Sequence, residues 1–320
     1  MSVSLLGGCA KNTAAPQAPL ATIETVASAD ASYTAGRYDD AFKNYRAVYK
    51  RSDLNPELVR GMAKAKLAAA DMLGPGEGAS DADWAIVVEG CDRLMSRGAL
   101  DALTARECGR SYLMRGDAQP AAQALGVAVQ GLPSDGEAHS AYAAALGATG
   151  RLGDAVRHAT RATELKPESA SAFGNLGALL MLSSQPKSAL TAYSRALQLE
   201  PEIARRHADV GSARVLLGDH AAGVQAYEKA ISLEPGRASF YASLGFARLG
   251  TGDGAGALSA CEKATQLDAR SVPGWVNLAV VHARAKRFAE ARAALAYAEN
   301  VDAADVRVKQ VREELAAAPK

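Results

Sequence analysis

The chain has 320 residues, with 36 Lys and Arg against 35 Asp and Glu, so its formal net charge is only +1. This balance excludes a strongly basic nucleic-acid-binding protein and an acidic disordered tail, and the length exceeds what one compact core usually reaches. Four cysteines exclude a disulfide-dense scaffold, and no apolar run is long enough to predict a membrane-spanning helix.

The first 21 residues stand outside the helical repeat that follows. Residues 5–10 read Leu-Leu-Gly-Gly-Cys-Ala, and residues 11–21 are rich in Ala, Pro, Thr and Gln. An aliphatic residue and two small residues before a cysteine resemble the bacterial lipobox, here matched by Leu6, Gly7, Gly8 and Cys9. The resemblance implies lipidation of Cys9, and Ala10 in place of Asp implies outer-membrane sorting. Residues 11–21 then form a flexible tether.

The segment before the lipobox departs from a signal peptide. Residues 1–4 contain no Lys or Arg, and the apolar run that follows is short. Two explanations remain open. Either the true start lies upstream of Met1 and residues 1–21 are a remnant signal, lipobox and tether, or Gly8-Cys9 is a chance pair in a cytoplasmic protein.

Residues 22–101 predict two irregular helical hairpins. The first begins near residue 22 and turns at Gly36, because glycine adopts the left-handed conformation that ends a helix. The second covers residues 56–101 and is degenerate. Its Gly- and Pro-rich stretch near 74–82 predicts an inserted surface loop.

From about residue 102 to 305, small residues recur every 34 residues. Two such series are Ala121, Ala155, Ala189, Gly223, Ala257, Ala291 and Ala128, Ala162, Ala196, Ala230, Ala264, Ala298. A third series is Gly109, Ala143, Gly177, Gly211, Gly245, Ala279, and prolines recur at 133, 167, 201 and 235. Small residues allow two helices to approach closely, and proline follows a helix end. The pattern predicts helical hairpins in series.

These residues resemble the tetratricopeptide repeat. The best copy, 170–203, has its motif residues at Phe173, Leu176, Gly177, Leu180, Ala189, Tyr193, Ala196 and Pro201. The resemblance implies an all-α, right-handed superhelical solenoid of about eight helical hairpins over residues 22–305. Residues 306–320 are then a capping helix and tail, since an array must cover the apolar side of its last repeat.

In this family one face of each hairpin's first helix lines a peptide-binding groove. By that resemblance, the candidate groove residues are Asn175, Met181, Leu182, Leu216, Phe246, Asn277 and Val280. The set is mostly apolar, which suits a hydrophobic or amphipathic segment. Two alternatives stay open: the asparagines bind a peptide backbone or are merely common in the repeat, and the apolar residues contact a ligand or pack between helices.

The residues suited to chemistry are scattered. No nucleophile and base are arranged for catalysis, so we predict no catalytic residue, no metal site and no cofactor. His139 and His207 fall where the repeat has an aromatic residue, so packing explains them. Cys91 and Cys108 occupy packing positions on helices that should meet; we favour free thiols over a disulfide.

The sequence therefore predicts a protein-interaction scaffold and not an enzyme. The favoured hypothesis is an outer-membrane lipoprotein, facing the periplasm and anchored through a lipid on Cys9, that helps to assemble a pilus or secretion machine. It resembles the tetratricopeptide lipoprotein of the tight-adherence (Flp) pilus and the pilotins of type IV pili, which implies a secretin or another machine component as protein partner and no nucleic acid. The alternatives are a cytoplasmic adaptor or regulator, and a non-catalytic arm of an envelope enzyme complex.

Overall fold

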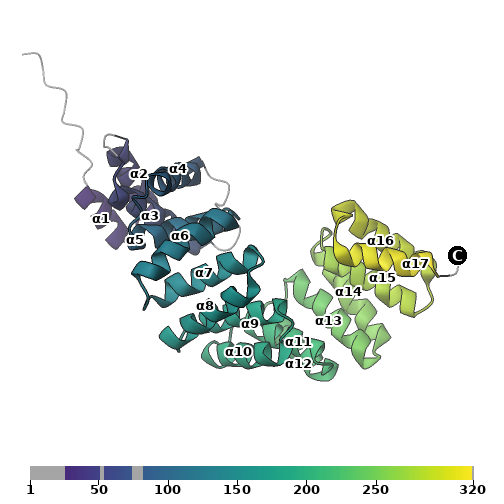
Figure 1. The fold of residues 1–320 in the computed structure, drawn as a ribbon. Helices are drawn as coiled ribbons and strands as arrows, with labels where there is room; N and C mark the ends of the chain where they lie inside the picture. The colour runs from purple at the N-terminus through teal and green to yellow at the C-terminus, as the bar shows by residue number, and fades with distance from the viewer. Residues whose placement is uncertain (1–25, 51–53, 74–81, 319–320) are drawn as a thin grey trace, which may run out of the picture. The chain divides into compact units, whose positions relative to one another are not determined.

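A computed structural model describes residues 26–50, 54–73 and 82–318. Over these ranges the secondary structure consists of 17 α-helices and contains no strand (Figure 1). The helices follow one another as consecutive pairs with a last helix at the end, which confirms the predicted all-α array of hairpins. Within the described ranges, none of the helices combines the length and apolar character needed to cross a bilayer.

The chain forms two compact units, of which the first ends at Arg115 and the second begins at Gly116. The first unit contains α1 (Val26–Thr34), α2 (Tyr38–Tyr49), α3 (Pro56–Leu73), α4 (Ala82–Ser96) and α5 (Ala102–Met114). Its largest fully buried side chains include Trp84, Tyr112 and Phe42. Helix α2 packs between α1 and α3, and α5 packs against both α3 and α4.

The second unit contains α6 (Ala118–Gly131), five hairpins and a last helix, α17 (Val306–Ala316). Their first helices are α7 (Gly136–Ala148), α9 (Ala170–Leu182), α11 (Ala204–Leu216), α13 (Ala238–Thr251) and α15 (Val272–Arg284). Their second helices are α8 (Leu152–Leu165), α10 (Pro186–Leu199), α12 (His220–Leu233), α14 (Gly254–Leu267) and α16 (Phe288–Asp302). Each helix packs against the next, and successive first helices also touch.

The small residues predicted from the repeat lie where helices meet. Ala189 and Ala196 on α10 are fully buried. A Cβ added to Gly177 would lie 2.5 Å from the ring of Tyr193, and one added to Gly245 would lie 2.3 Å from the Cys261 sulfur. Both distances are shorter than van der Waals contact, so a side chain at either position would push the two helices apart.

Each hairpin turn has one residue in the left-handed conformation. Gly150, Gly218 and Gly252 have φ of 80°, 83° and 83°. At the equivalent place two other turns use Ser184 and Lys286, with φ of 57° and 59°. The turn geometry is therefore kept even where a side chain makes it costly.

The residues of the predicted repeat over 102–135 fall in both units, with α5 in the first and α6 in the second. Helix α5 is attached to its own unit by a hydrogen bond from Thr104 Oγ1 to the Pro56 carbonyl (3.4 Å). A disulfide, described below, joins α5 to α4. The capping helix, α17, buries Val308 and Val311, whereas its first residue, Val306, is exposed.

Candidate functional site

Three large apolar side chains are exposed on successive first helices of the second unit. Leu182 on α9 is 64% exposed, Leu216 on α11 is 63% exposed and Phe246 on α13 is 45% exposed. Leu182 and Leu216 are the last residues of their helices and occupy the same place in the repeat, 34 residues apart. We call Leu182, Leu216 and Phe246 the first-helix face.

The exposed side chains of the first-helix face have apolar surface available for a partner. Burying a leucine side chain is worth about 1.5–3 kcal/mol, so three neighbouring apolar residues offer a substantial driving force for association. Scattered exposed apolar residues are ordinary, and only the repetition on successive first helices makes these three a candidate contact surface. This arrangement suits the apolar side of an amphipathic segment.

Met181 and Val280, also predicted in the groove, are only partly exposed. Met181 packs against the buried cluster that includes Leu180 and Tyr193. Val280 packs against the cluster that includes Val276. Both side chains already contribute to the core, so they have less surface to offer a ligand.

The two predicted asparagines bind the neighbouring first helix. The Asn175 side-chain amide donates a hydrogen bond to Ser140 Oγ on α7 (3.1 Å). The Asn277 side-chain amide donates to the Ala242 carbonyl on α13 (2.9 Å). In each case the bond joins successive first helices across one repeat. These bonds show what the two side chains contact in the folded chain, and binding of a peptide backbone by either asparagine stays a prediction.

Asp209 was not among the candidate residues, although it stands at the repeat position of Asn175 and Asn277. Burial raises the pKa of its carboxyl group, while Arg205 and Arg206, each 3.9 Å away, act in the opposite direction. Burial, with Asp209 nearby, also raises the pKa of Tyr193 to about 12. The sequence signal for Asp209 was its acidic side chain at a repeat position that holds asparagine at 175 and 277.

Two histidines and one tryptophan bond to the connections between repeats. His139 and His207 each hydrogen-bond through Nε2 to the carbonyl of the proline six residues earlier, at 3.2 and 2.8 Å. Trp275 donates from Nε1 to the Ala269 carbonyl (2.9 Å) in the same way. His139 and His158 also meet through their Nδ1 atoms at 2.9 Å. In the described part of the chain, no three His, Cys, Asp or Glu side chains converge as metal ligands would.

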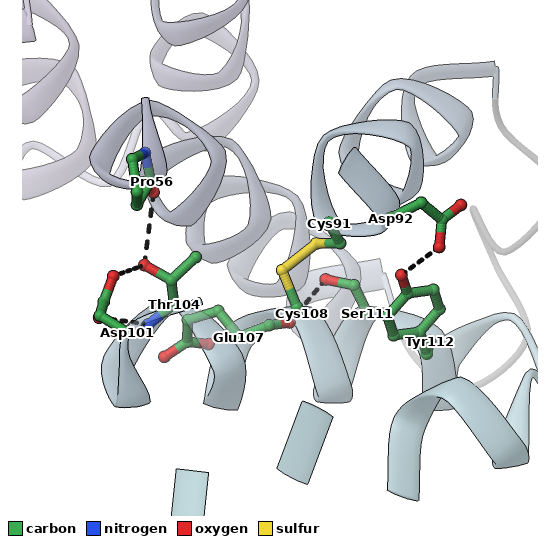
Figure 2. Close-up of a disulfide and its surroundings, with 9 residues drawn as sticks. All are labelled: Pro56, Cys91, Asp92, Asp101, Thr104, Glu107, Cys108, Ser111 and Tyr112. Atoms are coloured by element: carbon green, nitrogen blue, oxygen red, sulfur yellow. Dashed lines mark hydrogen bonds between the residues drawn. A yellow bond between two sulfur atoms is a disulfide. The ribbon is translucent and has the colours of Figure 1, made fainter. Parts of the chain in front are cut away.

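Cys91 on α4 and Cys108 on α5 form a disulfide (Figure 2), with their Cα atoms 5.7 Å apart. The expectation that free thiols were favoured is therefore wrong. The two helices pack closely enough for the sulfurs to meet, and Tyr112 reinforces the contact by donating to Asp92 (2.5 Å). Cys261 is a free thiol, and burial raises its pKa to about 12.

Other predicted features lie outside the described residues. These are Cys9 with its lipobox and tether, and the loop near 74–82 except for its last residue. The candidate site is accordingly the first-helix face of the second unit. It has an exposed apolar series, the half-buried carboxylate of Asp209 and asparagines bonded to neighbouring first helices.

Comparisons with known proteins agree with this architecture. Family models described as tetratricopeptide repeat match residues 143–204, 204–237 and 248–315. A search of curated protein sequences gave no significant match.

Two solved structures illustrate the likeness in fold. The APC/C hetero-tetramer Cut9–Hcn1 matches with a TM-score of 0.62 and 16% identity, covering 90% of this chain and 54% of that one. PilF of Pseudomonas aeruginosa matches with a TM-score of 0.54 and 17% identity, covering 70% of this chain and 99% of that one. The chain thus spans about half the length of the first relative, and identities this low show the fold alone.

Proposed function

We propose that this chain, which carries tetratricopeptide repeats over residues 143–237 and 248–315, is a scaffold of the bacterial envelope that helps to assemble a multiprotein machine. The coarse role, protein interaction, is the typical role of this repeat. The finer role is the binding of an apolar or amphipathic segment of a membrane-associated protein on the first-helix face.

The observation that carries the proposal is the exposed apolar series Leu182, Leu216 and Phe246. These side chains lie on adjacent helices, so one bound segment can contact all three. Met181 and Val280 pack against the core, and the asparagines join α9 to α7 and α15 to α13. A preformed surface avoids much of the ordering cost of binding.

The disulfide between Cys91 and Cys108 supports the envelope part of the proposal. Disulfides persist in oxidising compartments such as the bacterial periplasm and are rare in the cytosol, where thiols are kept reduced. The bond therefore favours the lipoprotein hypothesis, with a lipid on Cys9, over a cytoplasmic adaptor. An outer-membrane anchor would leave the repeats facing the periplasm.

We further propose that the machine is a pilus or secretion system and that the partner is a secretin or a protein that accompanies it. The support is the combination of lipobox, tether and repeats, which resembles the lipoproteins of tight-adherence and type IV pilus systems. A non-catalytic arm of an envelope enzyme complex would have the same lipobox, tether and repeats. Identification of the bound partner therefore distinguishes this alternative from a pilus or secretion protein.

The anchor is tested by fractionating cells that express the protein from its native locus, beside a Cys9→Ser variant. We expect wild-type protein in the outer membrane with the added mass of acyl chains, and loss of both in the variant. Unmodified soluble protein in both strains would refute the anchor.

The partner is tested by placing a photo-crosslinking amino acid at position 216 in vivo and identifying the product by mass spectrometry. We expect a cross-link to a pilus or secretion component that is lost when Leu182→Glu is added. The matched control is Val127→Glu, which changes an exposed apolar residue on α6 and should leave the cross-link intact. Cross-links to a cell-wall hydrolase or a polysaccharide polymerase instead would refute the proposed machine.

A further inference from the structure

Two pockets of the second unit occupy the same place in the repeat, 68 residues apart. The larger, about 910 Å³, lies among α8, α9, α10 and α11, and we call it the Phe173 pocket. The smaller, about 420 Å³, lies among α12, α13 and α14, and we call it the Tyr241 pocket. Both are lined mainly by second helices and by the residues of the first helix that face them, and neither includes a residue of the first-helix face.

The Phe173 pocket combines an apolar lining with a polar edge. Its apolar residues include Phe173, Leu176, Leu180 and Leu190, and its hydroxyl groups come from Thr160, Ser188, Thr191 and Ser194. Its only charged lining residues are Arg195 and Arg214, with no carboxylate. The volume lies in the range of ordinary ligand pockets, about 300–1,000 Å³.

The two arginines differ in how they are engaged. Arg214 pairs with Asp219 at 3.1 Å. Arg195 lies over the Phe173 ring, 6.0 Å from its centroid, and donates one hydrogen bond to Gln198 Oε1 (3.3 Å). Among the described residues, no carboxylate lies within ion-pair distance of Arg195. A guanidinium has five N–H donors, so Arg195 keeps donors for a ligand.

The Tyr241 pocket has lost this chemistry at equivalent positions. Glu228 replaces Thr160, Glu262 replaces Ser194 and Lys263 replaces Arg195. Arg248, in the place of Leu180, donates to Glu228 at 2.8 Å. The positive charges of the Tyr241 pocket are therefore balanced by its own carboxylates, whereas Arg195 in the Phe173 pocket has no carboxylate beside it.

We propose that the Phe173 pocket is a second docking site, which binds an acidic segment of a protein partner. An aliphatic side chain of that segment fills the space beside Phe173 and Leu176. A neighbouring Asp or Glu side chain pairs with Arg195, where two parallel N–H···O bonds fit a carboxylate. The hydroxyl groups at the edge hydrogen-bond the segment's backbone.

The charge pattern favours a peptide over the other anionic partners. A nucleic acid or an anionic membrane is held by many cations acting together, and the chain's net charge is only +1. One arginine beside an apolar pocket instead matches one carboxylate beside one aliphatic side chain. The site is separate from the first-helix face, so a partner could contact both or two partners could bind at once.

The test uses the full chain and a phage-displayed library of random 12-residue peptides without free carboxyl termini. We expect the selected peptides to carry Asp or Glu next to Leu, Ile, Val or Met. Synthetic copies with blocked ends should bind Arg195→Gln about tenfold more weakly than wild type, the loss expected for a charged hydrogen bond of about 1.5 kcal/mol. The matched variant Lys263→Gln should keep wild-type affinity.

Other results would overturn this proposal and separate it from the function proposed above. Peptides that ignore Arg195→Gln but lose binding with Leu216→Glu would assign recognition to the first-helix face and leave that function standing. Equal losses with Arg195→Gln and Lys263→Gln would show non-specific attraction. Selection of no acidic peptide, with Arg195-dependent binding to vesicles of phosphatidylglycerol, would assign the pocket to a membrane.

Discussion

The two compact units are stabilised by different kinds of contact. In the first, large aromatic side chains such as Trp84 and Tyr112 fill the core, the disulfide joins α4 to α5, and the buried Glu107 carboxylate pairs with Arg106 and Arg110. In the second, alanine and glycine recur at fixed places and the helices approach closely. The first unit thus adds a disulfide and a buried ion-paired carboxylate to its aromatic packing, whereas the second repeats the same close helix contacts along the chain.

The largest difference should follow removal of the disulfide. The double variant Cys91→Ala/Cys108→Ala opens a loop whose ends are 17 residues apart, and such a bond contributes about 3 kcal/mol. We expect faster hydrogen exchange in α4 and α5 and little change in α9–α12. Cys261→Ala is the control in the second unit. Unchanged exchange in α4 and α5 would show that packing alone holds the first unit.

Enlarging a small residue should affect the second unit instead. Ala189→Leu and Ala196→Leu each force side-chain carbons into a filled helix contact, which costs about 1–3 kcal/mol. Denaturant unfolding followed by exchange in α9–α11 measures the loss. Ala221→Leu, on the exposed surface of α12, should change stability by less than about 0.5 kcal/mol. Neutral effects at both buried positions would contradict the repeat alignment.

The turns should respond in opposite directions. Gly218→Ala should destabilise the second unit by about 1 kcal/mol, because a Cβ is disfavoured at positive φ. Lys286→Gly should stabilise it by about 0.5 kcal/mol, since relief of strain exceeds the added chain entropy of glycine. Thermal unfolding of the two variants beside wild type tests the pair, and a shift in the same direction for both would contradict the explanation.

The smallest effect we predict concerns pH. All five histidines of the chain, at positions 139, 158, 207, 220 and 282, lie in the second unit. Burial, followed by the charge of His139, lowers the pKa of His158, and burial followed by Arg287 lowers that of His282. The folded state then binds fewer protons than the unfolded chain, so stability is lost as pH falls through the unfolded value of about 6.5.

Exchange measured from pH 7.5 to pH 5 tests this dependence in each unit. The second unit should lose protection as pH falls, and His158→Gln should reduce the slope. The first unit contains no histidine, so it serves as an internal control over this range. An equal loss of protection with falling pH in both units would show that carboxyl groups, and not histidines, cause the pH dependence.

Much of the fold could be predicted because the repeat is a local signal. Residues such as Gly177 and Ala189 recur at a fixed spacing, and each marks a contact within its own hairpin or the next. The exposed leucines at 182 and 216 could be predicted for the same reason. The division of the chain between Arg115 and Gly116 could not be predicted, because it depends on which helices group into one compact unit and the repeat pattern alone does not decide that.

The sites depended more on distance. Asn175 and Asn277 were recognisable by position, but their hydrogen bonds to α7 and α13 depend on how close successive helices lie. The same holds for Cys91 and Cys108, whose bonding requires Cα atoms within about 7 Å on two separate helices. The Phe173 pocket is lined by residues of four helices. Because none of these residues is an Asp or Glu, Arg195 has no carboxylate partner there.

The sequence alone determined that the chain is an array of helical hairpins and where the small residues lie, because a fixed period couples each residue to its own helix face. The tertiary structure decided which cysteines are bonded, which polar groups are already satisfied and which arginine remains available. These properties depend on separations of a few ångströms between helices, and hydrogen bonds, disulfides and ion pairs form only within that range.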